Sequence, residues 1–214
     1  MKSLGNVLIL GDSYSTFWGH IAGDCRPYYT PTYKDSDVHR VEDTWWHCVI
    51  AATGSTLVEN SSYTGTCVCN RGYHGDDNKE FSFIGRLERR IANGFFATHR
   101  IDTVIVFGTT NDSWSDAPLG EAKFSDWTAE ELYTVRPACS YLLHRIREIL
   151  PDARVLVMLN YGLKEEIGAH LRKSCELFGA ELIALPDMEK QCNHPTVKGM
   201  GEIADTVLSY LNKE

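Results

Sequence analysis

Residues 7–13, Val-Leu-Ile-Leu-Gly-Asp-Ser, join a short apolar run to a turn that carries a serine. The run Val7–Leu10 is typical of a buried strand, and Gly11 is typical of the residue that ends one. In an open α/β sheet, ligands bind beyond the carboxyl ends of the strands. Ser13 therefore stands where a nucleophilic hydroxyl would meet a substrate, although a serine after a glycine is more often a turn or N-cap residue.

Four further apolar segments are typical of short strands, and helical patterns lie between them. The other strands are expected at Thr56–Glu59, Asp102–Phe107, Arg154–Leu159 and Glu181–Leu185. Apolar spacing predicts helices over Thr44–Ala52, Ser82–Ala92, Ile167–Phe178 and Gly199–Leu211, and over a run from Thr128 to Ile149. That run opens with a capping-box pattern, and Pro137 should kink it or begin a new helix. The alternation predicts a three-layer α/β/α sandwich around a parallel sheet.

Size and composition narrow the class of protein. The chain has 214 residues, 43% of them hydrophobic, which suits one domain over residues 1–214. A formal net charge of -8 argues against nucleic acid as a partner, and no apolar stretch is long enough to span a membrane. Residues 1–5 are too short and broken for a secretory signal, so a cytoplasmic location is expected unless a leader has been removed.

The seven cysteines do not form a recognisable framework. Their irregular spacing predicts reduced thiols rather than disulfide bonds, and no metal or cofactor is expected. Cys67 and Cys69 are separated by one residue, which is not the spacing of a zinc knuckle. Asp112 is expected to brace the turn around Asn111.

A serine becomes a nucleophile at neutral pH when a base accepts its proton. His194 is the candidate base, because it follows the last predicted strand and precedes the last predicted helix, at the same edge of the sheet as Ser13. An oxyanion also needs hydrogen-bond donors. We expect these from the backbone N–H groups of Ser13 and Gly65 and from the side-chain amide of Asn111, which follow three predicted strands.

Four blocks of the chain resemble the SGNH (GDSL-type) serine hydrolases in their order, over nearly the whole length. They are GDSYS at residues 11–15, Gly65, GTTND at residues 108–112, and HPTVKGM at residues 194–200. The resemblance implies a flavodoxin-like, five-stranded parallel sheet of order 2-1-3-4-5 and serine esterase chemistry. It implies Ser13 as nucleophile, His194 as base, and an oxyanion hole of Ser13, Gly65 and Asn111.

One position departs from the family pattern. The family usually places an aspartate three residues before its histidine, and here that position is Gln191, which carries no negative charge. Either Gln191 or a backbone carbonyl orients the imidazole of His194. Alternatively, Asp187 or Glu189 supplies the carboxylate, or the enzyme is weak or inactive.

Three long connections follow strand ends and should gather beside the serine: residues 14–43, 65–80 and 112–126. They are rich in Trp and Tyr, whose rings either anchor the loops or form a stacking wall for a sugar or an aromatic acyl group. The candidates for substrate contact are Asp12, Trp18 and Trp114.

The function expected from these features is hydrolysis of a small ester, such as an O-acetyl group, on a carbohydrate. The partner is then a small-molecule ester, such as an acylated sugar. Two alternatives remain open. One is a lysophospholipase, thioesterase or acyltransferase on the same scaffold. The other is a carbohydrate-binding member that has lost efficient catalysis, which the glutamine at position 191 would favour.

Overall fold

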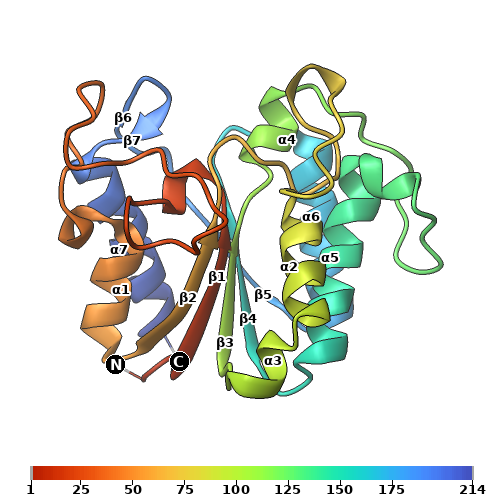
Figure 1. Ribbon diagram of the computed structural model, residues 1–214, viewed down its shortest axis with the longest axis horizontal. Coiled ribbons are helices and arrows are strands. Elements are labelled where there is room, and N and C mark those ends of the chain that lie inside the picture. Colours follow the sequence, from red (N-terminus) through yellow and green to blue (C-terminus); the bar gives the residue numbers. More distant parts are fainter. Residues whose placement is uncertain (1, 214) are drawn as a thin grey trace.

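The computed structural model describes residues 2–213 and contains a five-stranded parallel sheet of order β2-β1-β3-β4-β5 (Figure 1). Its strands are β1 (Asn6–Gly11), β2 (Thr56–Ser62), β3 (Thr103–Phe107), β4 (Arg154–Leu159) and β5 (Glu181–Ala184). The predicted fold class and strand order are confirmed. Strands β1, β3, β4 and β5 coincide with apolar runs of the sequence, because strands covered on both faces need side chains without polar groups. The edge strand β2 runs three residues beyond the predicted Thr56–Glu59, through the polar Asn60, Ser61 and Ser62.

Helices cover both faces of this sheet. Helices α1 (Trp45–Thr53) and α7 (Val197–Leu211) pack on one face, and α2 (Phe83–Ala92), α5 (Val135–Ile149) and α6 (Glu165–Phe178) pack on the other (Figure 1). Alternate residues of β1 enter the two cores. Val7 and Ile9 join the core under α1 and α7, while Leu8 and Leu10 join the core under α2, α5 and α6. The three-layer arrangement follows from this alternation.

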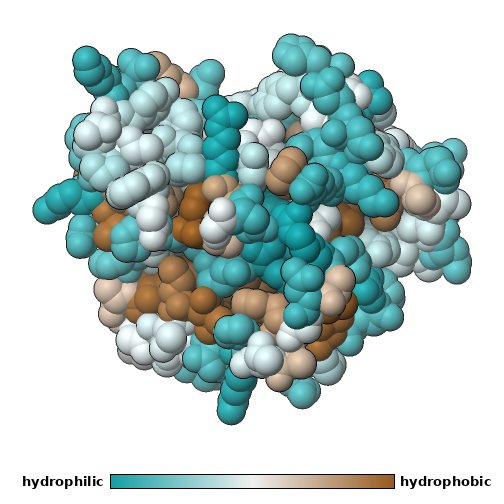
Figure 2. Space-filling view, in the orientation of Figure 1, coloured by the Kyte–Doolittle hydropathy of each residue, from teal (hydrophilic) through white to brown (hydrophobic). Residues whose placement is uncertain are grey.

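The register of the strands gathers the loops of interest at one edge. Gly11 at the end of β1 lies beside Ser62 of β2 and Phe107 of β3. The segments that follow these three residues therefore leave the sheet next to one another. Figure 2 shows hydrophilic side chains over much of the upper part of the molecule, and a notch at the top between its two sides. Within the described residues, no helix is long and apolar enough to cross a membrane.

The run from Thr128 to Ile149 divides into two elements, and the second begins close to Pro137, as one of the two alternatives for this proline predicted. Thr128 and Glu131 form the reciprocal bonds of a capping box, but only a short 3-10 turn, Glu131–Tyr133, follows them. Helix α5 begins afresh at Val135 and carries Pro137 within its first turn, where a proline costs little.

Several short elements were not predicted. They are α3 (Phe95–Thr98), α4 (Thr110–Trp114), the strands β6 (Lys190–Gln191) and β7 (His194–Pro195), and the 3-10 turns Ser13–Ser15, Val41–Asp43 and Tyr73–Gly75.

Candidate active site

The predicted nucleophile lies in a tight turn directly after β1. Ser13 begins the 3-10 turn Ser13–Ser15, and the carboxylate of Asp12 caps this turn by accepting a hydrogen bond from the backbone N–H of Tyr14 at 3.0 Å. Ser13 is 5% exposed. Its Oγ lies 3.0 Å from Nε2 of His194, so the two predicted partners are within hydrogen-bond distance although they are 181 residues apart.

His194 lies in a short hairpin that was not predicted from the sequence. Strands β6 and β7 are joined by Cys192 and Asn193, whose φ values of 50° and 62° are both positive, as in a type I′ turn. The hairpin lies at the top of the molecule, above α7 and close to the first long loop (Figure 1). Nδ1 of His194 lies 2.9 Å from the carbonyl oxygen of Cys192. A carbonyl only accepts, so this bond places the proton on Nδ1 and leaves Nε2 free to accept from Ser13.

The backbone carbonyl of Cys192 faces Nδ1 of His194, where the family usually has an aspartate carboxylate. Gln191 is exposed and is paired with His194 only through the hairpin. Asp187 is also exposed, and its carboxylate accepts a hydrogen bond from the backbone N–H of Met188. Glu189 is bound to the Thr196 hydroxyl and the Lys198 ammonium group. Of the readings left open by the sequence, the geometry matches orientation by a backbone carbonyl.

The three expected oxyanion donors lie on neighbouring segments. Within residues 2–213, the backbone N–H groups of Ser13 and Gly65 have no intramolecular acceptor. Gly65 has a φ of 75°, which favours glycine, and its Cα faces open space. Asn111 lies in α4 rather than in an open turn, and its Nδ2 donates to the carbonyl of Thr66 at 2.9 Å. The hydroxyl of Tyr73 donates to its Oδ1 at 2.8 Å, so the amide is fixed and one of its two N–H bonds remains available.

Arg86 connects the nucleophile turn with the segment that carries Gly65. This arginine of α2 is fully buried, and Nη2 donates to the carbonyl of Gly11 at 3.0 Å and to the hydroxyl of Thr66 at 3.2 Å. Nη1 donates to the carbonyl of Ser61, and Nε donates to the carbonyl of Phe81 at 2.9 Å. The planar guanidinium thus binds the ends of β1 and β2 at once.

Burial sets the charge state of the groups at the turn. Desolvation lowers the pKa of His194, against the smaller opposing effect of its bond to the Cys192 carbonyl. The imidazole is therefore neutral, as a base must be. Burial raises the pKa of Asp12 to about 7, and its Oδ2 has no hydrogen-bond partner. Asp12 is 1% exposed, so it lies beneath the turn and does not fit the expected role in substrate contact.

The two predicted tryptophans are exposed near the site. Trp18 is 62% exposed, and its backbone N–H donates to the carbonyl of Tyr29, on the loop that faces His194. Trp114 is 42% exposed and lies 6.4 Å from the ring of Tyr14, measured between ring centroids, in an edge-to-face arrangement. Tyr14 in turn lies beside His194. Both indoles are thus free to contact a ligand.

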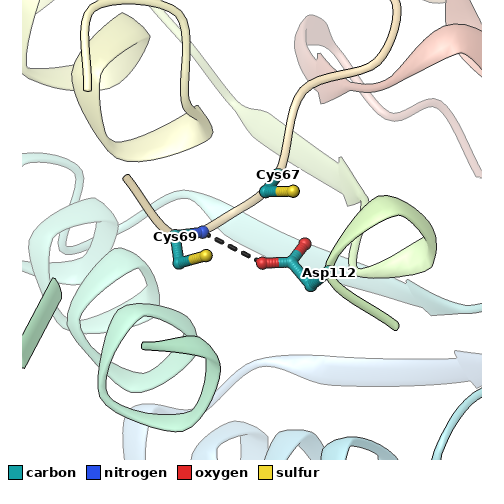
Figure 3. A group of neighbouring side chains, drawn as sticks. All are labelled: Cys67, Cys69 and Asp112. Carbon is teal, nitrogen blue, oxygen red and sulfur yellow. Dashed lines mark hydrogen bonds between the residues drawn. The ribbon is translucent and has the colours of Figure 1, made fainter. Parts of the chain in front are cut away.

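One cluster has the residue types of a metal site but not its chemistry. The thiols of Cys67 and Cys69 and the carboxylate of Asp112 lie within 4.8 Å of one another, all buried (Figure 3). The Asp112 oxygens already accept hydrogen bonds from the backbone N–H groups of Val68 and Cys69, at 2.8 and 3.1 Å. The hydrogen bond with the neighbouring Cys67 thiol and, after it, burial raise the pKa of Cys69, which opposes the thiolate that a metal needs. Asp112 instead anchors the loop next to Asn111.

The sequence did not single out several residues around the imidazole. Tyr28 and Tyr29 belong to the first long connection, and Tyr14 lies inside the GDSYS block. These rings come from segments without periodicity, so nothing in the sequence indicates where they point. Arg86 lies on the buried face of the amphipathic helix α2, and a cation at such a position of the helical pattern is the available indication for it.

Comparisons with known proteins identify the family of this chain. The family model of the GDSL-like lipase/acylhydrolases matches residues 5–211. A solved structure from Bacteroides ovatus, described as a GDSL-like lipase, is 37% identical with a TM-score of 0.91, and the match covers 100% of both chains. A GDSL-like lipase structure from Bacteroides uniformis is 39% identical with a TM-score of 0.89, covering 98% of this chain and 96% of that one.

A more distant structure shares the fold. The acetyl xylan esterase of Butyrivibrio proteoclasticus is 18% identical with a TM-score of 0.65, and the match covers 100% of this chain and 64% of that one. No curated protein gave a significant match. The family model spans nearly the whole chain, and the two Bacteroides structures match it closely over their full length. The chain therefore belongs to the GDSL-like lipase/acylhydrolase family and is a carboxylic ester hydrolase of the SGNH type.

Proposed function

We propose that this protein is a serine esterase that removes short acyl groups, O-acetyl above all, from a carbohydrate, with Ser13 as nucleophile and His194 as base. The observation that carries the proposal is the 3.0 Å bond between Ser13 Oγ and Nε2 of His194, together with the Cys192 carbonyl at Nδ1. Neutral imidazole in this tautomer can accept the serine proton.

The reaction would proceed in two halves. Nε2 of His194 takes the proton from Ser13 Oγ as this oxygen attacks the ester carbonyl carbon, and the carbonyl π electrons move to its oxygen. The backbone N–H groups of Ser13 and Gly65 and the remaining N–H of Asn111 would stabilise that oxyanion. The intermediate collapses when the alcohol leaves with the proton from His194. A water molecule then gives a proton to His194 as its oxygen attacks the acyl carbon, and the acid leaves when the bond to Ser13 Oγ breaks and Oγ takes the proton back from His194.

The substrate class rests on what surrounds the serine. Within residues 2–213, the exposed large hydrophobic side chains are few, and the two next to the nucleophile and the Asn111 helix are the indoles of Trp18 and Trp114. Flat aromatic faces suit the C–H faces of a sugar ring, whereas a long acyl chain would need a continuous aliphatic surface. The acetyl xylan esterase shares only the fold with this chain, and it is an example of this scaffold serving a sugar ester.

The test is a panel of nitrophenyl and sugar esters, with a fluorophosphonate label for the nucleophile. We expect acetyl esters to be preferred, Ser13→Ala to abolish both hydrolysis and labelling, and Trp114→Ala to raise KM for the sugar ester alone. Ser15→Ala is the matched control, because Ser15 is a buried serine in the same turn whose hydroxyl has no hydrogen-bond partner. Labelling that persists in Ser13→Ala, or a preference for long-chain esters, would overturn the proposal.

A further inference from the structure

The imidazole of His194 is enclosed by tyrosine rings rather than by charges. The ring of Tyr28 lies parallel to it, with 3.5 Å between centroids and 8° between planes. Tyr14 lies at 5.6 Å with a tilt of 58°, and Tyr29 lies at 6.3 Å, edge to face at 83°. We call these three rings the tyrosine cage.

The cage is built into the two segments that form the site. The hydroxyl of Tyr14 donates to the carbonyl of Asn193 at 2.7 Å, and the hydroxyl of Tyr29 donates to the carbonyl of Pro195 at 2.9 Å. These two bonds hold the hairpin on either side of His194. The stacked ring is held separately, by edge-to-face contacts with Tyr29 at 4.9 Å and with Tyr33 at 5.0 Å.

The backbone of the stacked residue is tied to the nucleophile turn. The hydroxyl of Thr16 accepts a hydrogen bond from the N–H of Tyr28 at 2.8 Å and donates to the carbonyl of Ser13 at 2.9 Å. A shift of Ser13 therefore moves the stacked ring with it. The ring is part of the geometry of the base and not a side chain that merely covers the loop.

The groups that face the imidazole can be named from every segment packed against it. They are Ser13 and Tyr14 of the nucleophile turn, Tyr28 and Tyr29 of the first long loop, and Cys192 of the hairpin. Burial raises the pKa of all three cage tyrosines, so the rings are neutral. Within residues 2–213, no carboxylate is hydrogen-bonded or ion-paired to His194.

When His194 accepts the serine proton, a positive charge appears in a cage that holds no negative one. The face of an aromatic ring carries the negative part of its quadrupole, and a parallel ring at this distance presents that face to the charge. We propose that Tyr28 is a positioning residue of the base: its stacked ring stabilises the imidazolium form of His194, as a substitute for the absent carboxylate. The inference rests on the proposed function for its catalytic consequence, but not for the interaction itself.

The test distinguishes the electrostatic effect of the Tyr28 ring from its steric effect. Tyr28→Phe keeps the aromatic face, and Tyr28→Leu removes it. A series of phenylalanines with progressively fluorinated rings at position 28 makes the face less negative without changing the shape of the ring. NMR titration of the His194 imidazole is measured beside the pH profile of kcat/KM. We expect the pKa of His194 and the plateau rate to fall along the fluorinated series and in Tyr28→Leu, by about tenfold in rate for the loss of the face.

If the ring of Tyr28 merely covered the imidazole, its removal would change the pKa of His194 in the opposite direction. Its removal would admit water and raise the pKa of His194, because desolvation is what lowers it. A pKa that rises or stays constant along the fluorinated series overturns the proposal, and so does a Tyr28→Phe variant that loses as much as Tyr28→Leu. The NMR titration needs no turnover. If the protein neither hydrolyses esters nor binds the fluorophosphonate label, the proposed function fails while the titration still decides the role of Tyr28.

Discussion

Replacement of Arg86 by methionine should damage stability and activity together. The variant Arg86→Met removes the guanidinium donors from the carbonyl groups of Gly11, Ser61 and Phe81. Gly11 keeps a second donor, the N–H of Tyr63 at 3.2 Å, and Phe81 is only half-buried. The full cost of an unpaired buried acceptor, roughly 2 kcal/mol, therefore applies to Ser61, and about 1 kcal/mol applies to each of the other two, which makes roughly 4 kcal/mol in all. Removing a buried cation offsets part of this cost, because burial lowers the pKa of Arg86 from 12.5 to about 10, which corresponds to ~3 kcal/mol against the charged form. The net loss should be about 1 kcal/mol.

The effect on catalysis follows from the position of these acceptors. Gly11 is the last residue of β1 and Ser61 the penultimate residue of β2, the strands that precede the proposed nucleophile and Gly65. A displacement of about 1 Å at a reacting group costs on the order of a hundredfold in rate. Urea unfolding followed by tryptophan fluorescence and kcat on a short acyl ester measure the two effects. Arg89→Met is the matched control, since Arg89 lies on the same helix with its side chain 28% exposed in a surface ion pair. Equal, small losses in the two variants would refute the reasoning.

Three further predictions concern the nucleophile turn and its base. Since burial lowers the pKa of His194, the acid limb of kcat/KM should have its midpoint below the ordinary histidine value of about 6.5, and a midpoint above that value would contradict the neutral buried imidazole. Burial raises the pKa of Asp12 from 3.8 to about 7, so between these two pH values the folded protein keeps a proton on Asp12 that the unfolded chain releases. The contribution of Asp12 to the free energy of unfolding therefore falls as the pH rises from about 4 to about 7. Asp12→Asn should flatten that part of the pH dependence in urea unfolding, and an unchanged slope would count against it. Gly11→Ala would place a Cβ 2.4 Å from Ser62 Oγ and 2.7 Å from Ser15 Cβ, so we expect the free energy of unfolding to fall by about 1–3 kcal/mol in the same assay. The control Gly23→Ala, at an open position, should change it by less than about 0.5 kcal/mol.

The sheet and its order were predictable because they depend on signals that lie within one short segment or in a family pattern. Each central strand is an apolar run that ends in a turn, and the runs alternate with helical patterns. The proposed nucleophile and base follow from the same reasoning, since the carboxyl ends of parallel strands share one edge. Their mutual distance is a property of the fold that the sequence could only imply.

The surroundings of the base were not predictable for physical reasons. The β6–β7 hairpin has two residues per strand and turns through Cys192 and Asn193, without the glycine that usually marks a type I′ turn. The stacking of Tyr28 on His194 joins two loops that carry no hydrophobic period. Asp12 departs from expectation for another reason, because a charged residue in a turn is usually exposed, whereas this aspartate is buried.

The distance in sequence between Ser13 and His194 has a consequence for biosynthesis. Chains fold from the N-terminus as they are made, so the nucleophile turn emerges long before the hairpin that carries the base. That hairpin leads directly into α7, which must dock on α1 before His194 has a fixed place. A nascent chain that has completed all five strands thus still carries an inert serine. Acquisition of esterase activity should therefore follow the docking of α7, which makes labelling of Ser13 a reporter of that docking in a translating mixture.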